Sequence, residues 1–172
     1  MIIRASIVAD KEIFAKVLID KKSPFLKSII INKGSRNNIK LGMAVLDGIY
    51  FIGKIVEVNY VTSRVLLISD INSKIPVSLE PNGIQAIMSG NGASNGVIEY
   101  VNQSNLESKN LDLIVFTSGM DGVFKSGIPV GRIIKEKDSS NISSVVDFYK
   151  DLSQLKYVKI LSYKNDNLNK VF

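Results

Sequence analysis

The sequence predicts an all-β protein built as an antiparallel barrel or sandwich. Short apolar runs rich in valine and isoleucine recur along the 172 residues, at spacings of about 8–15 residues. Gly, Asn, Pro or Asp stands in most of the gaps between them, as expected of tight turns. Helical periodicity is weak throughout: the best candidates, Ile7–Phe14 and Tyr149–Leu155, would each make about two turns. We therefore expect many short strands and little helix.

In the first half of the chain the expected strands form a meander. Asp47-Gly48 is the strongest hairpin signal, because glycine adopts a positive φ without strain and apolar runs flank the pair. Residues 59–63 then separate the long strand after this turn from the next one. The strands expected here are 15–19, 27–31, 43–46, 49–58 and 65–69.

The second half repeats this pattern. The segment 89–96 is small, polar and rich in glycine, so we expect a flexible loop there. Apolar runs with β-branched residues lie on both sides of it. The strands expected in this half are 84–88, 97–101, 113–116, 129–135, 144–148 and 157–161.

The composition excludes most common catalytic and metal chemistry. The chain has no Cys, His or Trp, so it cannot form disulfides, Cys or His metal sites, or Ser-His and Cys-His dyads. Its formal net charge is +6, which permits attraction to anionic partners. The basic residues are scattered and form no tract, however, so a solvent-facing surface rich in lysine is the preferred explanation of the charge.

Several motifs resemble catalytic or nucleotide-binding sites but are incomplete. Gly48–Lys54 has the spacing of a phosphate-binding loop, yet Ile55 stands where a magnesium-binding hydroxyl is required. Ser153-Gln-Leu-Lys156 lacks the companion elements of penicillin-interacting serine enzymes. Thr117-Ser118-Gly119 follows Phe116 rather than the carboxylate of an aspartic protease turn, and Asp70 is expected to be a turn residue. The sequence predicts no catalytic residue, no metal site and no cofactor.

One run of glycine, proline and threonine positions is distinctive. Thr117-Ser118-Gly119 is followed by Gly122-Val123-Phe124 and then by Gly127-Ile128-Pro129-Val130-Gly131. Together with earlier segments, this run resembles the extracytoplasmic part of the MreC family of rod-shape-determining proteins over about residues 15–161. Leu111-Asp112 and Asn38 stand at turns where the family more often has Gly-Asp and Gly. The positions expected to shape turns and motifs are Gly34, Gly42, Gly48, Gly53, Thr117, Ser118, Gly119, Gly122, Gly127, Pro129 and Gly131.

The resemblance implies two small six-stranded β-barrels, of which the first is built from discontinuous segments. It maps residues 1–14 to the end of a coiled-coil linker or short helix and 15–68 with 155–163 to the first barrel. It maps 69–154 to the second barrel and 164–172 to a C-terminal tail. No run reaches the roughly 18 apolar residues of a membrane span. We therefore expect this sequence to lack the family's N-terminal anchor in the inner membrane.

The resemblance also implies a function. Members of the family are non-enzymatic scaffolds of the cell-elongation machinery in the periplasm. They self-associate as dimers or filaments, bind and activate the class B penicillin-binding transpeptidase, and work with MreD, MreB and RodA. An alternative is a small basic barrel that binds RNA, because Gly53–Val58 is similar to strands of ribosomal SH3-like barrels. The scattered basic residues and the lack of an aromatic stacking platform speak against nucleic acid.

Two apolar segments are candidates for a protein-interaction surface. Ile49, Tyr50 and Phe51 follow the Asp47-Gly48 turn, so at least one of them should point outward, although all three could belong to the core. Phe124 and Pro129 lie in an expected loop, which would expose apolar surface if no partner covered it. We expect one of these segments to contribute to a self-association or transpeptidase interface.

Overall fold

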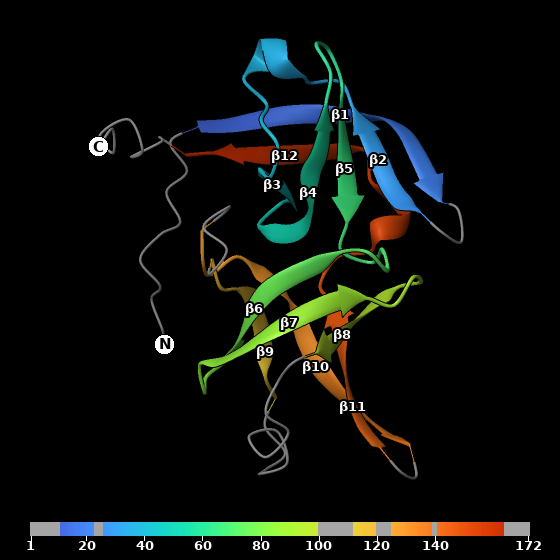
Figure 1. Cartoon of the computed structure of the whole chain (residues 1–172), viewed down its shortest axis with the longest axis vertical. Helices are drawn as coiled ribbons and strands as arrows, with labels where there is room; N and C mark the ends of the chain where they lie inside the picture. Colours follow the sequence, from blue (N-terminus) through green and yellow to red (C-terminus); the bar gives the residue numbers. More distant parts are fainter. Residues whose placement is uncertain (1–10, 23–25, 100–111, 120–124, 139–140, 164–172) are drawn as a thin grey trace.

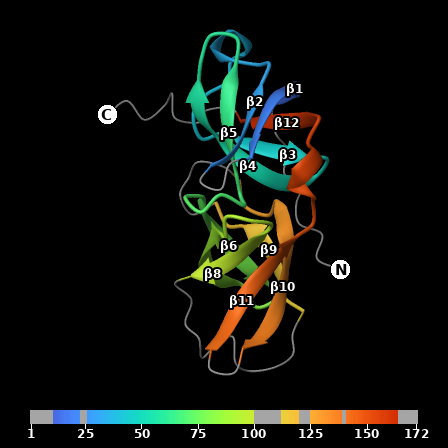
Figure 2. The same cartoon turned by 90° about the vertical axis from the view of Figure 1, so that its right-hand side faces the viewer.

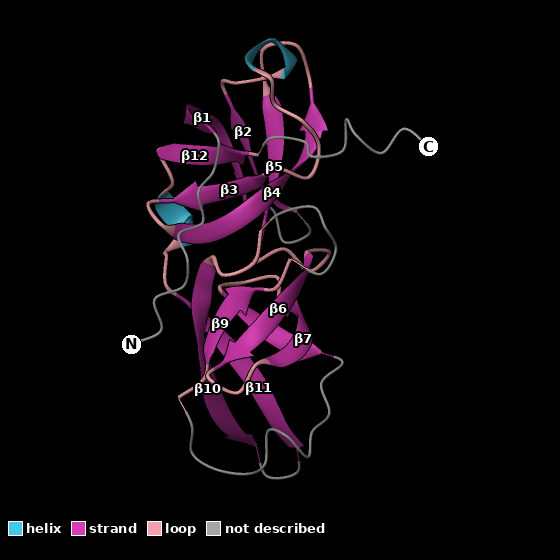
Figure 3. Cartoon of the chain, turned by 90° about the vertical axis from the view of Figure 1, so that its left-hand side faces the viewer, coloured by secondary structure: helices cyan, strands magenta, loops and turns pink. Residues whose placement is uncertain are grey.

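The chain folds into two six-stranded antiparallel barrels stacked along its long axis (Figure 1). The computed structural model describes residues 11–22, 26–99, 112–119, 125–138 and 141–163. Views from either side show the same stacking, with the first barrel above the second (Figures 2 and 3). The expected all-β class with two six-stranded barrels is confirmed.

The first barrel takes its last strand from the far end of the chain. Strand β12 lies between β1 and β3, so the chain leaves this barrel after β5 and returns to close it. The strand order around the barrel is β1-β12-β3-β4-β5-β2. Its strands are β1 (Lys11–Lys22), β2 (Lys27–Ile31), β3 (Ala44–Asp47), β4 (Tyr50–Val58), β5 (Ser63–Leu67) and β12 (Tyr157–Ser162).

The second barrel is continuous in sequence. Its strand order is β10-β11-β8-β7-β6-β9, and the chain then returns through a short 3-10 turn, Leu152–Gln154. The β10–β11 hairpin is its longest feature. Its strands are β6 (Lys74–Glu80), β7 (Ile84–Gly90), β8 (Asn95–Glu99), β9 (Ile114–Thr117), β10 (Pro129–Asp138) and β11 (Asn141–Phe148).

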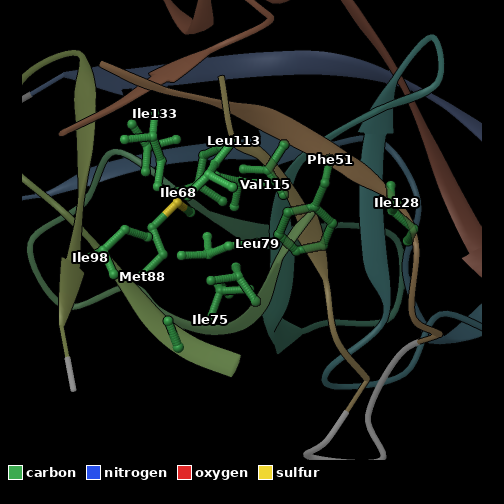
Figure 4. Packing of buried hydrophobic residues seen from close by; sticks show 14 of the residues in the cluster. Phe51, Ile68, Ile75, Leu79, Met88, Ile98, Leu113, Val115, Ile128 and Ile133 are labelled. Atoms are coloured by element: carbon green, nitrogen blue, oxygen red, sulfur yellow. The ribbon is translucent and has the colours of Figure 1, made fainter. Parts of the chain in front are cut away.

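Two apolar clusters form the cores. One fills the first barrel with inward-facing residues such as Ile29, Ile52 and Ile160. The other fills the second barrel and extends out of it to Phe51 and Leu161 of the first (Figure 4). The second core therefore continues into the junction between the barrels.

Two glycines allow neighbouring strands to approach closely. A Cβ atom on Gly53 of β4 would meet the carbonyl oxygen of Leu66, and one on Gly131 of β10 would meet that of Asp147. Glycine is the residue that fits where another backbone comes this close. Gly48 serves differently: it has a φ of 62° in the β3–β4 turn, as the hairpin prediction requires.

The start of the first strand differs from the expectation. Residues 1–14 were predicted to be linker and Ile7–Phe14 a short helix; residues 1–10 lie outside the described part, but Lys11–Phe14 belong to β1. The segment pairs with β12 from Lys11 opposite Ser162 onward. Ile13 and Ala15 face the barrel interior while Glu12 and Phe14 face outward, so a two-residue alternation overrides the weak helical pattern.

Two other local expectations are corrected. Tyr149–Leu155 is not a two-turn helix, because only Leu152–Gln154 form a 3-10 turn, capped by the Asp151 carboxylate at 2.9 Å from the Ser153 amide. The expected loop 89–96 is a hairpin whose ends belong to β7 and β8. Its turn is closed by the Asn91 side-chain oxygen, which accepts hydrogen bonds from the backbone amides of Ala93 and Asn95.

Strand β6 was not predicted, since Pro76 interrupts its apolar pattern. Proline has no amide proton and is normally excluded from inner strands. Here the Pro76 carbonyl accepts a hydrogen bond from the Ser118 amide at 3.1 Å, just beyond the end of β9. The Pro76 nitrogen therefore lies beyond the last paired residues of β6 and β9, Val77 and Thr117. Its missing proton removes no hydrogen bond of that ladder, so the strand tolerates proline.

Candidate interaction surfaces

Phe51 lies in the junction between the barrels and not on the surface. Its side chain is 1% exposed and belongs to the cluster that fills the second barrel. Figure 4 shows the ring directed toward Leu79 and Val115 of the second barrel. The prediction that Phe51 belongs to a partner surface is wrong, because the second barrel covers this part of the outer face of β4.

Tyr50 is half-buried and contacts the connection that follows the last strand of the second barrel. Its ring centroid lies 5.2 Å from that of Tyr149, at the start of the connection that returns from β11. Beside this pair, Lys150 Nζ lies 3.7 Å from Asp47 Oδ2 in the β3–β4 turn. Burial raises the pKa of the Tyr149 hydroxyl above its ordinary value. The β3–β4 turn is thus held against the returning connection by one ring contact and one ion pair.

Asp70 joins the barrels at the other connection. Its carboxylate is buried and accepts hydrogen bonds from the backbone amides of Asn72 and Lys27, each at 2.7 Å. The first bond forms the turn predicted for this residue. The second reaches the beginning of β2, 43 positions away, and no local pattern in the sequence indicates it.

Ile49 remains a candidate surface residue. It follows Gly48 in the β3–β4 turn and is 63% exposed. The same turn borders a hollow of about 200 Å3, which is also lined by Phe14, Tyr157 and Lys159. Neither aromatic residue was predicted as an interaction residue. Phe14 was missed because the expected strand began only at Ala15, and Tyr157 was expected only as the first residue of a strand. Recognition of the alternation from Lys11 onward would have placed Phe14 on the outer face.

A second, larger groove lies between the barrels. It has a volume of about 420 Å3, and its lining includes charged side chains from both: Lys27 from the first barrel, and Asp147, Lys150 and Asp151 from the second barrel and the connection after it. The mixture of charges gives it no dominant sign.

The Thr-Ser-Gly motif shapes a loop. Thr117 is buried, and its hydroxyl donates to the Lys125 carbonyl at 2.9 Å and accepts from the Ile128 amide at 3.0 Å. Its backbone amide in turn donates to the Ile128 carbonyl, and its carbonyl accepts from Gly127. One side chain therefore closes the base of the loop between β9 and β10.

The other motif positions lie in the same region or in turns of the first barrel. Ser118 donates its backbone amide to Pro76, and Pro129 is half-buried at the start of β10. Phe124 and Gly122 lie outside the described residues. Asn38 has a φ of 63°, so an asparagine occupies the left-handed conformation in this turn. The remaining positions are Gly34, packed against the backbone at Asn59 and Tyr60, and Gly42, Gly119 and Gly127, all with positive φ.

An ion pair lies on the exterior of the second barrel. Lys74 Nζ lies 2.9 Å from Glu99 Oε2 on the barrel exterior, and this hydrogen bond, with one from Ser89, lowers the pKa of the Glu99 carboxyl. Within the described residues, no group of three or more Asp and Glu side chains could hold a metal ion. No helix in that part is long and apolar enough to cross a membrane.

Comparison with known proteins gives one consistent family. The model "Rod shape-determining protein MreC, barrel core" matches residues 17–162. The cell shape-determining protein MreC of Cereibacter sphaeroides is 34% identical over 145 residues, which are 84% of this chain and 47% of that protein. The chain thus spans about half the length of this relative.

Solved structures agree with this match. The crystal structure of MreC from Pseudomonas aeruginosa superposes with a TM-score of 0.75 at 28% identity, covering 88% of this chain and 99% of that one. A structure described as the major periplasmic domain of the cell shape-determining filament MreC has a TM-score of 0.75 at 16% identity, covering 93% and 100%. A complex between a penicillin-binding protein and MreC from Helicobacter pylori has a TM-score of 0.63 at 18% identity, covering 88% and 99%; these last two show the fold alone.

Proposed function

This chain belongs to the MreC family of rod shape-determining proteins, and from that premise we propose that it is a scaffold of the bacterial cell-elongation machinery. In that role it binds and activates the peptidoglycan transpeptidase, a class B penicillin-binding protein. The observation that carries the proposal is the extent of the family match, 17–162, which includes both barrels and the junction between them. The Helicobacter pylori complex supports it, since an MreC there is bound to a penicillin-binding protein.

The proposal includes the arrangement and location of the whole protein. The two barrels act as its domains, with the division near residues 68–69 and the return near 155, and the periplasm is their compartment. The description of a related structure as a periplasmic domain supports this location. The full-length protein is anchored in the inner membrane, associates with itself, and works with MreD, MreB and RodA.

A scaffold role without catalysis fits how the family is described. Its members are named for determining cell shape, and the buried Thr117 hydroxyl holds a loop rather than facing a cavity. The alternative of an RNA-binding barrel gains no support from these relatives. Its test is oligonucleotide binding with a steep salt dependence, which we do not expect.

A binding measurement tests the proposal. The chain would be titrated by calorimetry into the periplasmic part of the class B penicillin-binding protein from the same bacterium, and separately into an unrelated periplasmic protein. We expect saturable binding to the first alone, and increased transpeptidase turnover in its presence. Absence of binding, with both proteins folded by circular dichroism, would contradict the proposed function.

A further inference from the structure

One outer face of the first barrel is half covered by the second barrel and half open. The strand registers place Phe14 opposite Lys159 and Leu46 opposite Phe51, and Lys159 also pairs with Leu46. These four residues therefore form one row across β1, β12, β3 and β4. Leu46 and Phe51 are buried in the junction, whereas Phe14 at the other end is 69% exposed. The row that packs on the second barrel thus continues through Lys159, whose ammonium group pairs with Glu12, to an uncovered aromatic ring at Phe14.

The uncovered part carries a second aromatic side chain and a hollow. Tyr157 lies opposite Lys16 in the register and is 68% exposed. Phe14 and Tyr157 line the hollow of about 200 Å3 together with the Asp47-Gly48 turn. The lining of this hollow therefore combines two aromatic rings with the charged side chains of Asp47 and Lys159. We call this region the Phe14 face.

The charge around the Phe14 face is positive. Both nearby carboxylates are paired within the chain: Glu12 with Lys159 at 3.2 Å, and Asp47 with Lys150 at 3.7 Å. By contrast, Lys16, the register partner of Tyr157, and Lys156, which precedes Tyr157 in the chain, are exposed. The structure gives neither of them an ion pair among the described residues. Unpaired lysines at the border of an apolar surface favour a partner with carboxylates in matching positions.

We propose that the Phe14 face is the docking site for a segment of a partner protein that carries apolar side chains flanked by acidic residues. The apolar side chains pack against Phe14 and Tyr157, and the carboxylates meet Lys16 and Lys156. Continuity with the junction supports the apolar half of this inference, and the free lysines support the acidic half. The inference goes beyond the proposed function, because it specifies a surface and a chemistry whichever protein supplies the segment.

Two synthetic peptides test this inference with the chain as it stands. Each contains a central Leu-Phe-Leu-Phe, flanked by three glutamates on both sides in one and by three lysines in the other. Fluorescence anisotropy of the labelled peptides gives affinity, and amide chemical shifts of the isotope-labelled chain give the location. We expect the glutamate peptide to bind at least about tenfold more tightly, to weaken with salt, and to shift amides of Phe14 and Tyr157.

Matched variants make the result decisive. We expect Phe14→Ala with Tyr157→Ala, and separately Lys16→Glu with Lys156→Glu, to reduce affinity at least about tenfold. Tyr60→Ala is the control: Tyr60 is 70% exposed, two residues beyond the end of β4, and its substitution should not change affinity. Equal loss in the control, or shifts confined to other strands, would overturn the proposal. A dimer in sedimentation that dissociates on the Phe14/Tyr157 substitutions would overturn it too, by assigning the face to a second copy.

Discussion

The carboxylate of Asp70 accepts a hydrogen bond from the backbone amide of Lys27, with 2.7 Å between Oδ2 and N. Asp70 lies in the connection that leads to the second barrel, and Lys27 begins strand β2 of the first. The other oxygen of the same carboxylate holds the turn at Asn72. One buried side chain therefore stabilises the connection and ties it to the first barrel.

Removal of this carboxylate should destabilise the whole chain. Asp70→Ala leaves the partly buried amide of Lys27 without its acceptor, and hydrogen bonds to charged acceptors contribute more than those to neutral ones. We expect the free energy of unfolding in urea to fall by about 2–3 kcal/mol. Asp112→Ala, at an exposed position before β9, is the control and should change it by less than about 0.5 kcal/mol. Equal effects at both positions would show that the bond to Lys27 contributes nothing.

Neighbouring residues of the β3–β4 hairpin should differ sharply in their importance for stability. Phe51→Ala removes a ring buried in the junction and should cost about 3–5 kcal/mol. Ile49→Ala, two positions earlier and exposed, should cost less than about 0.5 kcal/mol. Thermal and urea unfolding measure both. If Phe51→Ala proved as mild as Ile49→Ala, the rings and aliphatic groups around Phe51 could not form the packed junction described above.

Close backbone approach makes Gly53 intolerant of any side chain. Gly53→Ala would place a Cβ atom against the Leu66 carbonyl, so we expect a loss of about 1–3 kcal/mol or failure to fold. Gly83→Ala provides the comparison, because Gly83 has a φ of 69° but open space around it, and should cost about 1 kcal/mol from backbone strain alone. Unfolding free energies that rank Gly83→Ala as the more harmful change would contradict this account.

The Thr117 hydroxyl should be required for the loop between β9 and β10. Thr117→Val keeps the shape but leaves the buried Ile128 amide without an acceptor, so we expect a loss of about 1–3 kcal/mol. Thr117→Ser keeps the hydroxyl and should recover most of that loss. Hydrogen exchange of the Ile128 amide provides a local measurement, which should speed up in the valine variant only. Unchanged exchange in Thr117→Val would contradict the assigned role.

Local patterns in the sequence were sufficient to predict those features that depend on contacts between residues close together along the chain. The Asp47-Gly48 turn, the turn at Asp70 and most strands depend on residue type and two-residue alternation. The partners of Asp70 and Phe51 could not be predicted in the same way, because both contacts join segments far apart in sequence. Strand β6 was missed for a related reason: Pro76 is tolerated only because β9 ends beside it.

The candidate interaction surface could be predicted only in part, because its exposure depends on segments that are distant in sequence. The apolar residues after Gly48 were recognised, but alternation alone could not tell which of them another barrel would cover. Phe51 faces the second barrel, Tyr50 packs on Tyr149, and Ile49 stays exposed. Phe14 and Tyr157 form their hollow only through the pairing of β1 with β12, two strands from opposite ends of the chain.

Tyr163 should make the chain sensitive to alkaline pH. Burial raises the pKa of its hydroxyl to about 12, and the hydroxyl oxygen is buried with no hydrogen-bond partner among the described residues. The folded state therefore binds this proton more tightly than the unfolded state, whose tyrosine pKa is about 10. The stability linked to this proton is complete below pH about 10 and is lost as the pH rises toward about 12.

Tyr163→Phe tests both consequences. At neutral pH it removes an unsatisfied buried hydroxyl and should raise the free energy of unfolding by about 1 kcal/mol. The ring keeps its packing against the apolar cluster that fills the second barrel. Above pH about 10 the advantage over wild type should grow, because the variant has no proton to lose there. Tyr60→Phe, at an exposed position, is the control and should match the wild-type free energy of unfolding at neutral pH. Urea titrations between pH 7 and pH 11 measure this, and parallel curves for Tyr163→Phe and wild type would show that the hydroxyl ionises equally readily in the folded and unfolded chain.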